Sequence, residues 1–140
     1  MRATIRPASP ADIPRIMEIR HAVRENRLSD PDLVTSADCA AFIEHSDIWV
    51  WVEDDLILAF AAGDTRNGWI WALFVAPGHE GRGIGQALLP LACDTLRNGG
   101  HTSATLSTTE GTRADRFYRR NGWTAIGTND KGEIVFQKPI

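Results

Sequence analysis

The sequence predicts an α/β protein with a mixed sheet of about seven strands and four helices. Two observations carry this prediction. Residues 69–75 are seven consecutive apolar residues followed at once by a glycine-rich loop and an apolar helix, which is typical of a buried strand that leads into a helix. Around this unit the strand and helix patterns follow the order β-α-α-β-β-β-α-β-α-β-β, with no repeat and no linker. We therefore expect one domain, residues 1–140.

The chain begins with a short strand and an amphipathic helix. Residues 3–6 form the strand, which Pro7 ends. Ser9 is a good N-cap, and Pro10 suits the first helical position. The helix is expected to reach about residue 24, and one face shows helical spacing through Ile13, Ile16, Met17, Arg20 and Val23.

A polar stretch, a second helix and a hairpin follow. Residues 24–31 are polar and leave the first helix. Thr35 or Ser36 can cap the second helix. Residues 48–52 and 56–62 are apolar runs separated by three acidic residues, which predicts a β-hairpin.

The central strand and the C-terminal half complete the order. We expect the strand at residues 69–75 to be buried on both faces, with side chains alternating between them. One face would carry Trp69, Trp71 and Leu73, and the other Ile70, Ala72 and Phe74. The later elements are predicted at residues 83–97 (helix), 104–107 (strand), 112–121 (helix), 123–127 and 133–138 (terminal hairpin).

Composition narrows the classes of function. The chain is 43% hydrophobic and 24% charged, with a net charge of −3, so it carries no general basic footprint for nucleic acid. Cys39 and Cys93 lie in helical patterns and suit small core positions rather than a disulfide framework. The four histidines show no metal-ligand spacing, so no metal is expected. Without a membrane-spanning run or a signal-peptide pattern, we expect a cytoplasmic protein that binds no membrane.

The glycine-rich loop is the strongest functional signal. Gly81, Gly83 and Gly85 alternate with larger residues at the start of the third helix. Little side-chain bulk lets a ligand approach the backbone, and the free N–H groups of a helix N-terminus favour an anion. A phosphate or pyrophosphate cradle is the simplest interpretation, with a plain strand-to-helix turn as the alternative. A Walker loop would need a lysine, and a dinucleotide fingerprint would need glycine where Gln86 stands.

Two motifs resemble one family. Residues 75–89, VAPGHEGRGIGQALL, are similar to the acetyl-CoA motif Q/R-x-x-G-x-G/A of the GNAT superfamily of N-acetyltransferases. Residues 114–123, ADRFYRRNGW, resemble that family's late helix, A-x-x-F-Y-x-x-x-G-F. The resemblance implies the GNAT fold, whose sheet is mostly antiparallel and opens as a V-shaped cleft between strands 4 and 5.

The resemblance also implies the reaction. Acetyl-CoA would donate its acetyl group to a primary amine, which attacks the thioester directly in a ternary complex. The predicted cofactor-binding residues are Phe74, Val75, Glu80, Gly81, Arg82, Gly83, Ile84, Gly85, Gln86, Ala87 and Tyr118. Tyr118 falls where the family places a tyrosine near the CoA sulfur, so it would be the general acid.

Two positions depart from the family pattern, and the general base has no motif. Glu80 stands where the family has Gln or Arg, so we expect its side chain to point away from the phosphates. Gly111 stands where a cofactor-binding asparagine is common, and Thr109 or Thr112 could replace it. Glu25, with Asp30 second, is the candidate base, because its segment should border the acceptor site.

Several alternatives stay open at this stage. The chain could transfer a longer acyl group, or it could be a non-catalytic CoA-binding domain or sensor. The amine could belong to a small molecule or to a peptide. The terminal hairpin offers a sheet edge through which a homodimer could form.

Overall fold

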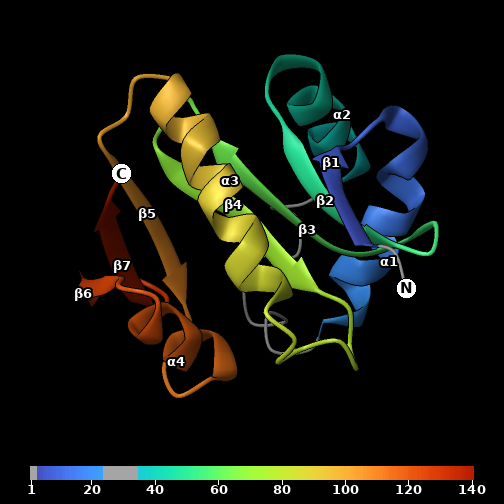
Figure 1. The fold of residues 1–140 in the computed structure, drawn as a ribbon. Coiled ribbons are helices and arrows are strands. Elements are labelled where there is room, and N and C mark those ends of the chain that lie inside the picture. The colour runs from blue at the N-terminus through green and yellow to red at the C-terminus, as the bar shows by residue number, and fades with distance from the viewer. Residues whose placement is uncertain (1–2, 24–34) are drawn as a thin grey trace.

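The computed structural model describes residues 3–23 and 35–140, which form an open sheet flanked by helices (Figure 1). The predicted order of strands and helices is confirmed. The elements are β1 (Ala3–Pro7), a 3-10 turn (Pro10–Asp12), α1 (Ile13–Ala22), α2 (Ser36–His45), β2 (Ile48–Glu53), β3 (Leu56–Asp64), β4 (Trp69–Val75), α3 (Ile84–Asn98), β5 (Ser103–Thr108), α4 (Arg113–Arg120), β6 (Thr124–Thr128) and β7 (Ile134–Pro139).

The sheet is divided at its centre. Its seven strands lie in the order β1-β2-β3-β4-β5-β7-β6, and every neighbouring pair is antiparallel except β4 and β5. These two parallel strands share a single residue pair, Trp69 with Thr105, at the start of β4. Beyond it their C-terminal ends spread apart (Figure 1). The V-shaped cleft predicted between strands 4 and 5 is therefore present.

Each face of the sheet has its own apolar core. On one face, α3 covers the middle of the sheet and packs with α4 residues against β3, β5 and β7. On the other face, α1 and α2 pack against β2, β3 and β4. Gly63 of β3 lets α3 approach closely, because a Cβ there would lie 2.7 Å from the carbonyl oxygen of Ala92.

A β-bulge in β4 overturns the predicted side-chain alternation. Pairing with β3 shifts by one residue between Ala72 and Ile70, which leaves Trp71 as the extra residue. Ile70 consequently packs in the α3-side core, whereas Trp71 and Phe74 both pack on the α1/α2 side. β4 packs against the cores on both faces, as predicted, but its burial is incomplete. Trp69 is 36% exposed and Leu73 half-buried, because the opening beside β5 leaves that side of the strand partly uncovered.

The helix starts show where local sequence signals suffice. The Thr35 hydroxyl accepts the Asp38 N–H at 3.1 Å, which confirms one of the two predicted caps of α2. Ser9 caps the short 3-10 turn instead, so α1 itself begins three residues later than Pro10. Cys39 and Cys93 are buried free thiols, as predicted.

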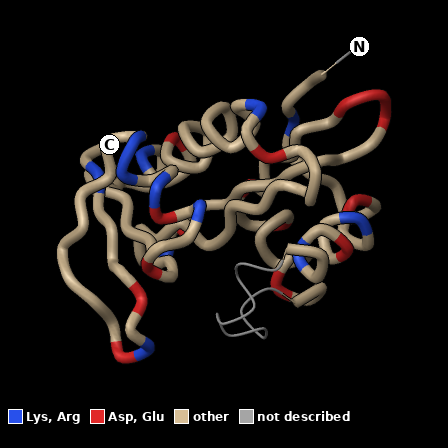
Figure 2. Tube along the Cα trace, turned by 90° about the horizontal axis from the view of Figure 1, so that it is seen from below, with Lys and Arg blue, Asp and Glu red and all other residues tan. Residues whose placement is uncertain are grey.

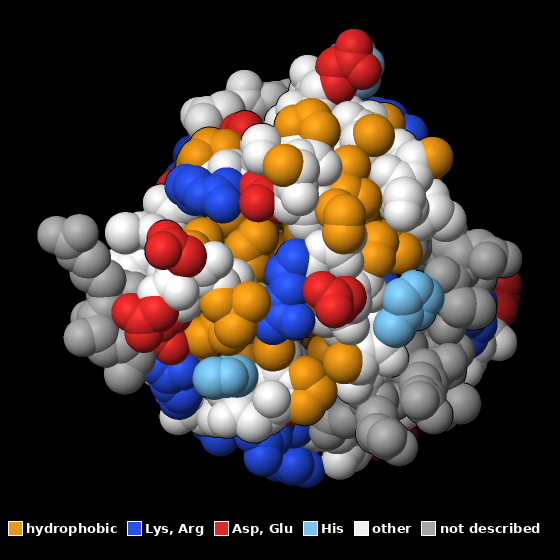
Figure 3. Space-filling model, turned by 90° about the vertical axis from the view of Figure 1, so that its right-hand side faces the viewer, with side chains coloured by type: hydrophobic (Ala, Val, Ile, Leu, Met, Phe, Trp, Pro, Cys, Tyr) orange, Lys and Arg blue, Asp and Glu red, His pale blue; other side chains and the backbone are white. Residues whose placement is uncertain are grey.

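Charge is unevenly distributed over the described residues. Figure 2 shows Lys and Arg close together on α4, at the opposite end of the molecule from the acidic tip of the β2–β3 hairpin. On the side of the molecule shown in Figure 3, hydrophobic side chains lie in small groups broken up by charged ones.

None of the helices in the described part is long and apolar enough to cross a membrane. β1 and β6 are the sheet edges, and all five residues of β6 are exposed. The predicted dimer contact through the terminal hairpin of β6 and β7 stays a prediction.

Candidate active site

The glycine loop presents backbone rather than side chains. Gly78, Gly81 and Gly83 all have positive φ, the last at 82°, and α3 begins immediately afterwards. A Cβ at Gly81 or Gly83 would have no atom within 4 Å, so both face open space. The first N–H groups of α3 have no intrahelical acceptor. The loop therefore offers an anion several N–H donors at the positive end of a helix dipole.

Glu80 and Arg82 both bind within the protein. The Glu80 carboxylate accepts the N–H of Gly78 at 2.9 Å, which holds the side chain against its own loop. Arg82 donates to both carboxylate oxygens of Glu53, at 2.7 and 3.1 Å, and lies 2.9 Å from the Nδ1 of His79. It does not line the cleft beside the loop. In the structure this side chain anchors the loop to the end of β2. A contact between Arg82 and the cofactor stays a prediction.

We call the hollow beside the glycine loop the loop cleft. It has a volume of about 850 Å³ and lies between the end of β4, the start of α3 and one face of α4. Three cations of α4 line it, spaced three and four residues apart: Arg113, Arg116 and Arg120. The loop cleft thus joins backbone N–H donors on one wall to guanidinium groups on the other, a combination that suits a polyphosphate.

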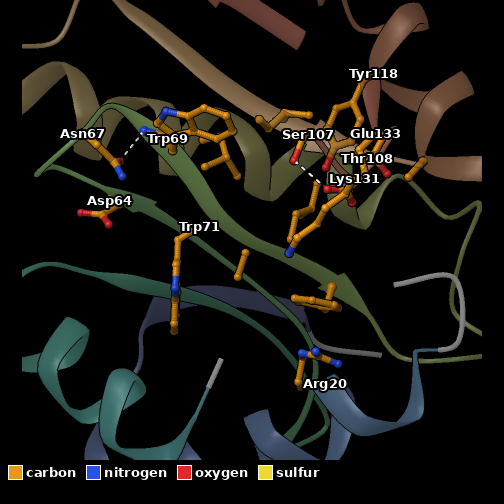
Figure 4. A pocket seen from close by; sticks show the side chains of 16 residues that line it. Arg20, Asp64, Asn67, Trp69, Trp71, Ser107, Thr108, Tyr118, Lys131 and Glu133 are labelled. Carbon is orange, nitrogen blue, oxygen red and sulfur yellow. Dashed lines mark hydrogen bonds between the residues drawn. The ribbon is translucent and has the colours of Figure 1, made fainter. Parts of the chain in front are cut away.

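A second hollow, which we call the strand pocket, lies where β4 and β5 diverge. It has a volume of about 280 Å³. Figure 4 shows Arg20 entering from α1 on one side, with Lys131 and Glu133 of the terminal hairpin on the other. Asp64 also lines it, but both of its carboxylate oxygens accept hydrogen bonds from Arg66, which lower the pKa of Asp64 below its usual value. Trp71 forms part of the wall and stacks on Phe42 of α2 with 4.0 Å between ring centroids.

The two hollows meet. Both are lined by Leu73 and Phe74 of β4 and by Ala114 and Tyr118 of α4. A ligand that fills the loop cleft along β4 therefore ends beside whatever occupies the strand pocket. This is the geometry needed to bring two substrates into contact.

Tyr118 is buried at this junction. It is 7% exposed, and its ring packs edge-on against Phe117 and Trp123. Burial, together with the nearby Cys93 thiol, raises the pKa of Tyr118 well above its ordinary value. The phenol therefore keeps its proton at all physiological pH values and can donate it as a hydrogen bond.

Most of the predicted cofactor residues come together at the loop cleft. Those that line it are Phe74, Val75, Glu80, Gly81, Gly83, Ile84, Gly85, Gln86 and Tyr118. Ala87 does not, and its N–H donates to the Gly83 carbonyl at 3.1 Å as part of the helix. Glu25 and Asp30, the candidate bases, lie outside the described residues.

The loop before α4 uses its polar groups internally. The Gly111 N–H donates to Asp115 at 2.9 Å, and the Gly111 carbonyl accepts from Arg116. The Thr112 hydroxyl accepts the Asp115 N–H and donates to the Thr109 carbonyl. Thr112, which we considered as a replacement for the missing asparagine, is therefore occupied as a helix cap.

Sequence reasoning missed three groups of site residues. Sequence analysis gave the arginines of α4 no role, although their helical spacing places Arg113, Arg116 and Arg120 on one side, where they line the loop cleft. Sequence analysis assigned Glu133 to the terminal hairpin and gave it no functional role. Arg20 fell on the apolar face of α1, where a cation is an anomaly that signals a site. Within residues 3–23 and 35–140, no group of His, Cys, Asp and Glu is arranged to hold a metal ion.

The fold is therefore an open α/β sheet in which a backbone anion cradle lies beside a smaller pocket. The sequence profile of the acetyltransferase (GNAT) family matches residues 13–123. The chain belongs to this family.

Solved structures agree on the fold. PaiA N-acetyltransferase from Thermoplasma acidophilum, in complex with coenzyme A, is 16% identical with a TM-score of 0.74, each chain being covered completely. YncA from Salmonella typhimurium, with its cofactor acetyl-CoA, is 21% identical over 99% of this chain and 94% of that one, with a TM-score of 0.77. N-acetylglutamate synthase from Neisseria gonorrhoeae, with coenzyme A and N-acetyl-glutamate, is 18% identical over 99% of this chain and 35% of its own, with a TM-score of 0.80. No curated protein matches the sequence.

Proposed function

We propose that the protein transfers an acetyl group from acetyl-CoA to a primary amine. The observation that carries this proposal is the meeting of the two hollows at Phe74 and Tyr118. Acetyl-CoA occupies the loop cleft, with its pyrophosphate on the N–H groups of residues 81–86 and its other phosphate near the α4 arginines. The amine occupies the strand pocket.

The open edge of β4 guides the cofactor arm. The Ala76 N–H donates to the Leu58 carbonyl of β3. Because N–H groups alternate along a strand, the Val75 N–H faces the other way, into the gap towards β5. The pantetheine amides pair with this edge as an added strand would, and the Val75 N–H polarises the thioester carbonyl.

The chemistry then requires one bond exchange and two proton movements. The amine nitrogen bonds to the thioester carbonyl carbon, and the C–S bond breaks. The departing thiolate takes the proton of the Tyr118 hydroxyl, which regains one from solvent. The proton lost by the amine passes to a carboxylate. Asp64 and Glu133 are the described carboxylates of the strand pocket, and Arg66 binds both oxygens of Asp64. Glu133, whose Oε1 accepts hydrogen bonds from Asn129 and Ser107, is our candidate acceptor beside the earlier candidate Glu25.

Calorimetry of acetyl-CoA binding tests the proposal. Gly83→Glu places a carboxylate where the pyrophosphate would lie, and we expect it to abolish binding that the wild type shows in the micromolar range, about 10⁻⁶ M. Gly100→Glu is the matched control, because Gly100 also has positive φ and open surroundings but follows the far end of α3. Wild-type protein that does not bind acetyl-CoA would overturn the proposed function, as would equal losses in both variants.

A further inference from the structure

Arg20 is the one buried cation among the described residues whose placement the fold does not explain. It is 6% exposed, yet it lies on the apolar face of α1 and lines the strand pocket. Its Nε is buried and donates to no acceptor in the described part of the chain. None of the ion pairs between described residues includes it. Burying a charge without a counter-ion is costly, so such a group is retained where a ligand neutralises it.

The surroundings hold Arg20 in place and aim it at the pocket. Its guanidinium carbon lies 5.5 Å from the centre of the Phe74 ring, a favourable cation–π arrangement. Phe74 in turn stacks on Phe60 with 5.2 Å between centroids. Figure 4 shows the guanidinium at the end of the side chain, turned towards the cavity. Aromatic rings thus support the cation from one side and leave its terminal N–H groups to the pocket.

The other charges of the strand pocket do not neutralise Arg20. Asp64 is bound by Arg66 at 2.9 Å on both oxygens. Glu133 lies on the opposite wall, where Asn129 donates to it at 3.1 Å. Lys131 adds a second cation on that wall. The pocket therefore has a guanidinium ready for an anion at its α1 side.

We infer that the amine acceptor is a small molecule that carries a carboxylate, and that Arg20 binds this carboxylate. This inference rests on the proposed function. A guanidinium offers two parallel N–H donors that match the two oxygens of a carboxylate. Because Phe74 lines both hollows, a carboxylate at Arg20 lies near the end of the cofactor arm, so an amine on a neighbouring carbon reaches the thioester. An amino acid is the simplest molecule that fits both this chemistry and a volume of about 280 Å³.

The test compares amines that differ only in the carboxylate. Thiol release from acetyl-CoA is measured with free L-amino acids and with the corresponding amino acid carboxamides. For the wild type we expect kcat/KM to be about 10- to 100-fold higher with the best amino acid than with its amide. Arg20→Gln should remove this preference by lowering the amino acid value alone. Arg20→Lys should restore part of it, because it keeps the charge but loses the two-point geometry.

Arg119→Gln is the matched control variant. Arg119 also lies over an aromatic ring, 5.4 Å from the centre of Phe136, but it lines neither hollow. It should keep the wild-type preference. Equal rates with acids and amides, or equal losses with both in Arg20→Gln, would overturn the inference.

The outcomes also separate the two proposals. Wild-type protein that binds acetyl-CoA and acetylates only amines without a carboxylate contradicts the role of Arg20 and leaves the proposed function standing. The same holds if acetyl-CoA binds and no free amino acid is acetylated. Failure to bind acetyl-CoA contradicts the proposed function itself, and the inference falls with it.

Discussion

Glu53 and Arg82 form a two-point ion pair between elements 29 residues apart, with donor–acceptor distances of 2.7 and 3.1 Å. The pair ties the end of β2 to the middle of the glycine loop. It uses the one cation of the loop for internal support, so the loop offers its backbone to a ligand in a fixed shape. Fixing a loop before binding lowers the entropy cost of binding.

Glu53→Gln should therefore weaken acetyl-CoA binding although Glu53 does not line the loop cleft. We expect a loss of about 3- to 10-fold in affinity by calorimetry, within the range of one charged hydrogen bond. In a double-mutant cycle, Arg82→Gln should add little to Glu53→Gln. Arg97→Gln, which removes an exposed ion pair with Asp94 on α3, is the control and should bind normally. Additive losses would contradict the anchoring role.

The same pair predicts a pH dependence of stability. Hydrogen bonds from Arg82 lower the pKa of Glu53 below its usual value. A carboxylate with a lowered folded-state pKa stabilises the protein above its unfolded pKa, and this contribution disappears as pH falls through the folded pKa. In urea unfolding, the wild type should therefore have a higher free energy of unfolding than Glu53→Gln at neutral pH. This difference should shrink below about pH 4. A difference that persists unchanged at pH 3, on the order of one unit below the usual glutamate value, would contradict this account.

Tyr118→Phe separates catalysis from binding. The ring contacts with Phe117 and Trp123 remain, so folding and acetyl-CoA affinity should be unchanged. Turnover should fall by about 10²- to 10⁴-fold if the hydroxyl is the general acid. Because the pKa of Tyr118 is raised, wild-type kcat should show no loss from phenol ionisation up to about pH 10. Unchanged turnover in the variant would mean that the phenol has only a structural role. A wild-type protein that binds acetyl-CoA but acetylates no amine would favour the alternative of a non-catalytic sensor.

Two glycines should respond to alanine in opposite ways. A Cβ at Gly63 would lie 2.7 Å from the Ala92 carbonyl and 2.8 Å from the Leu96 side chain, so Gly63→Ala should destabilise the fold by about 1–3 kcal/mol. A Cβ at Gly85 would meet Phe117 at 3.5 Å, an ordinary contact. Gly85→Ala should keep the stability, and it should also keep acetyl-CoA binding, because the family motif has glycine or alanine at this position. Thermal unfolding and calorimetry on both variants check the contrast, and equal stabilities would contradict the packing argument for Gly63.

Local signals in the sequence predicted the elements and the glycine loop well. Apolar runs, caps such as Thr35 and the stop after α3 depend on neighbours in the chain, so they can be recognised without the fold. The bulge at Trp71 could not be predicted, because it arises from pairing between β3 and β4. The ion pair of Arg82 could not be predicted either, because its partner Glu53 lies 29 residues away in the sequence. Arg20 was visible on the apolar face of α1, but only the pocket beside it gives that position a meaning.

The four residues shared by the two hollows also bear on the order of events. A molecule seated in the loop cleft covers Phe74 and Tyr118 and so becomes part of the wall of the strand pocket. The small pocket is complete only when the large one is filled. Saturation with acetyl-CoA should thus sharpen the selection of the amine, and by thermodynamic reciprocity the correct amine should raise the affinity for acetyl-CoA.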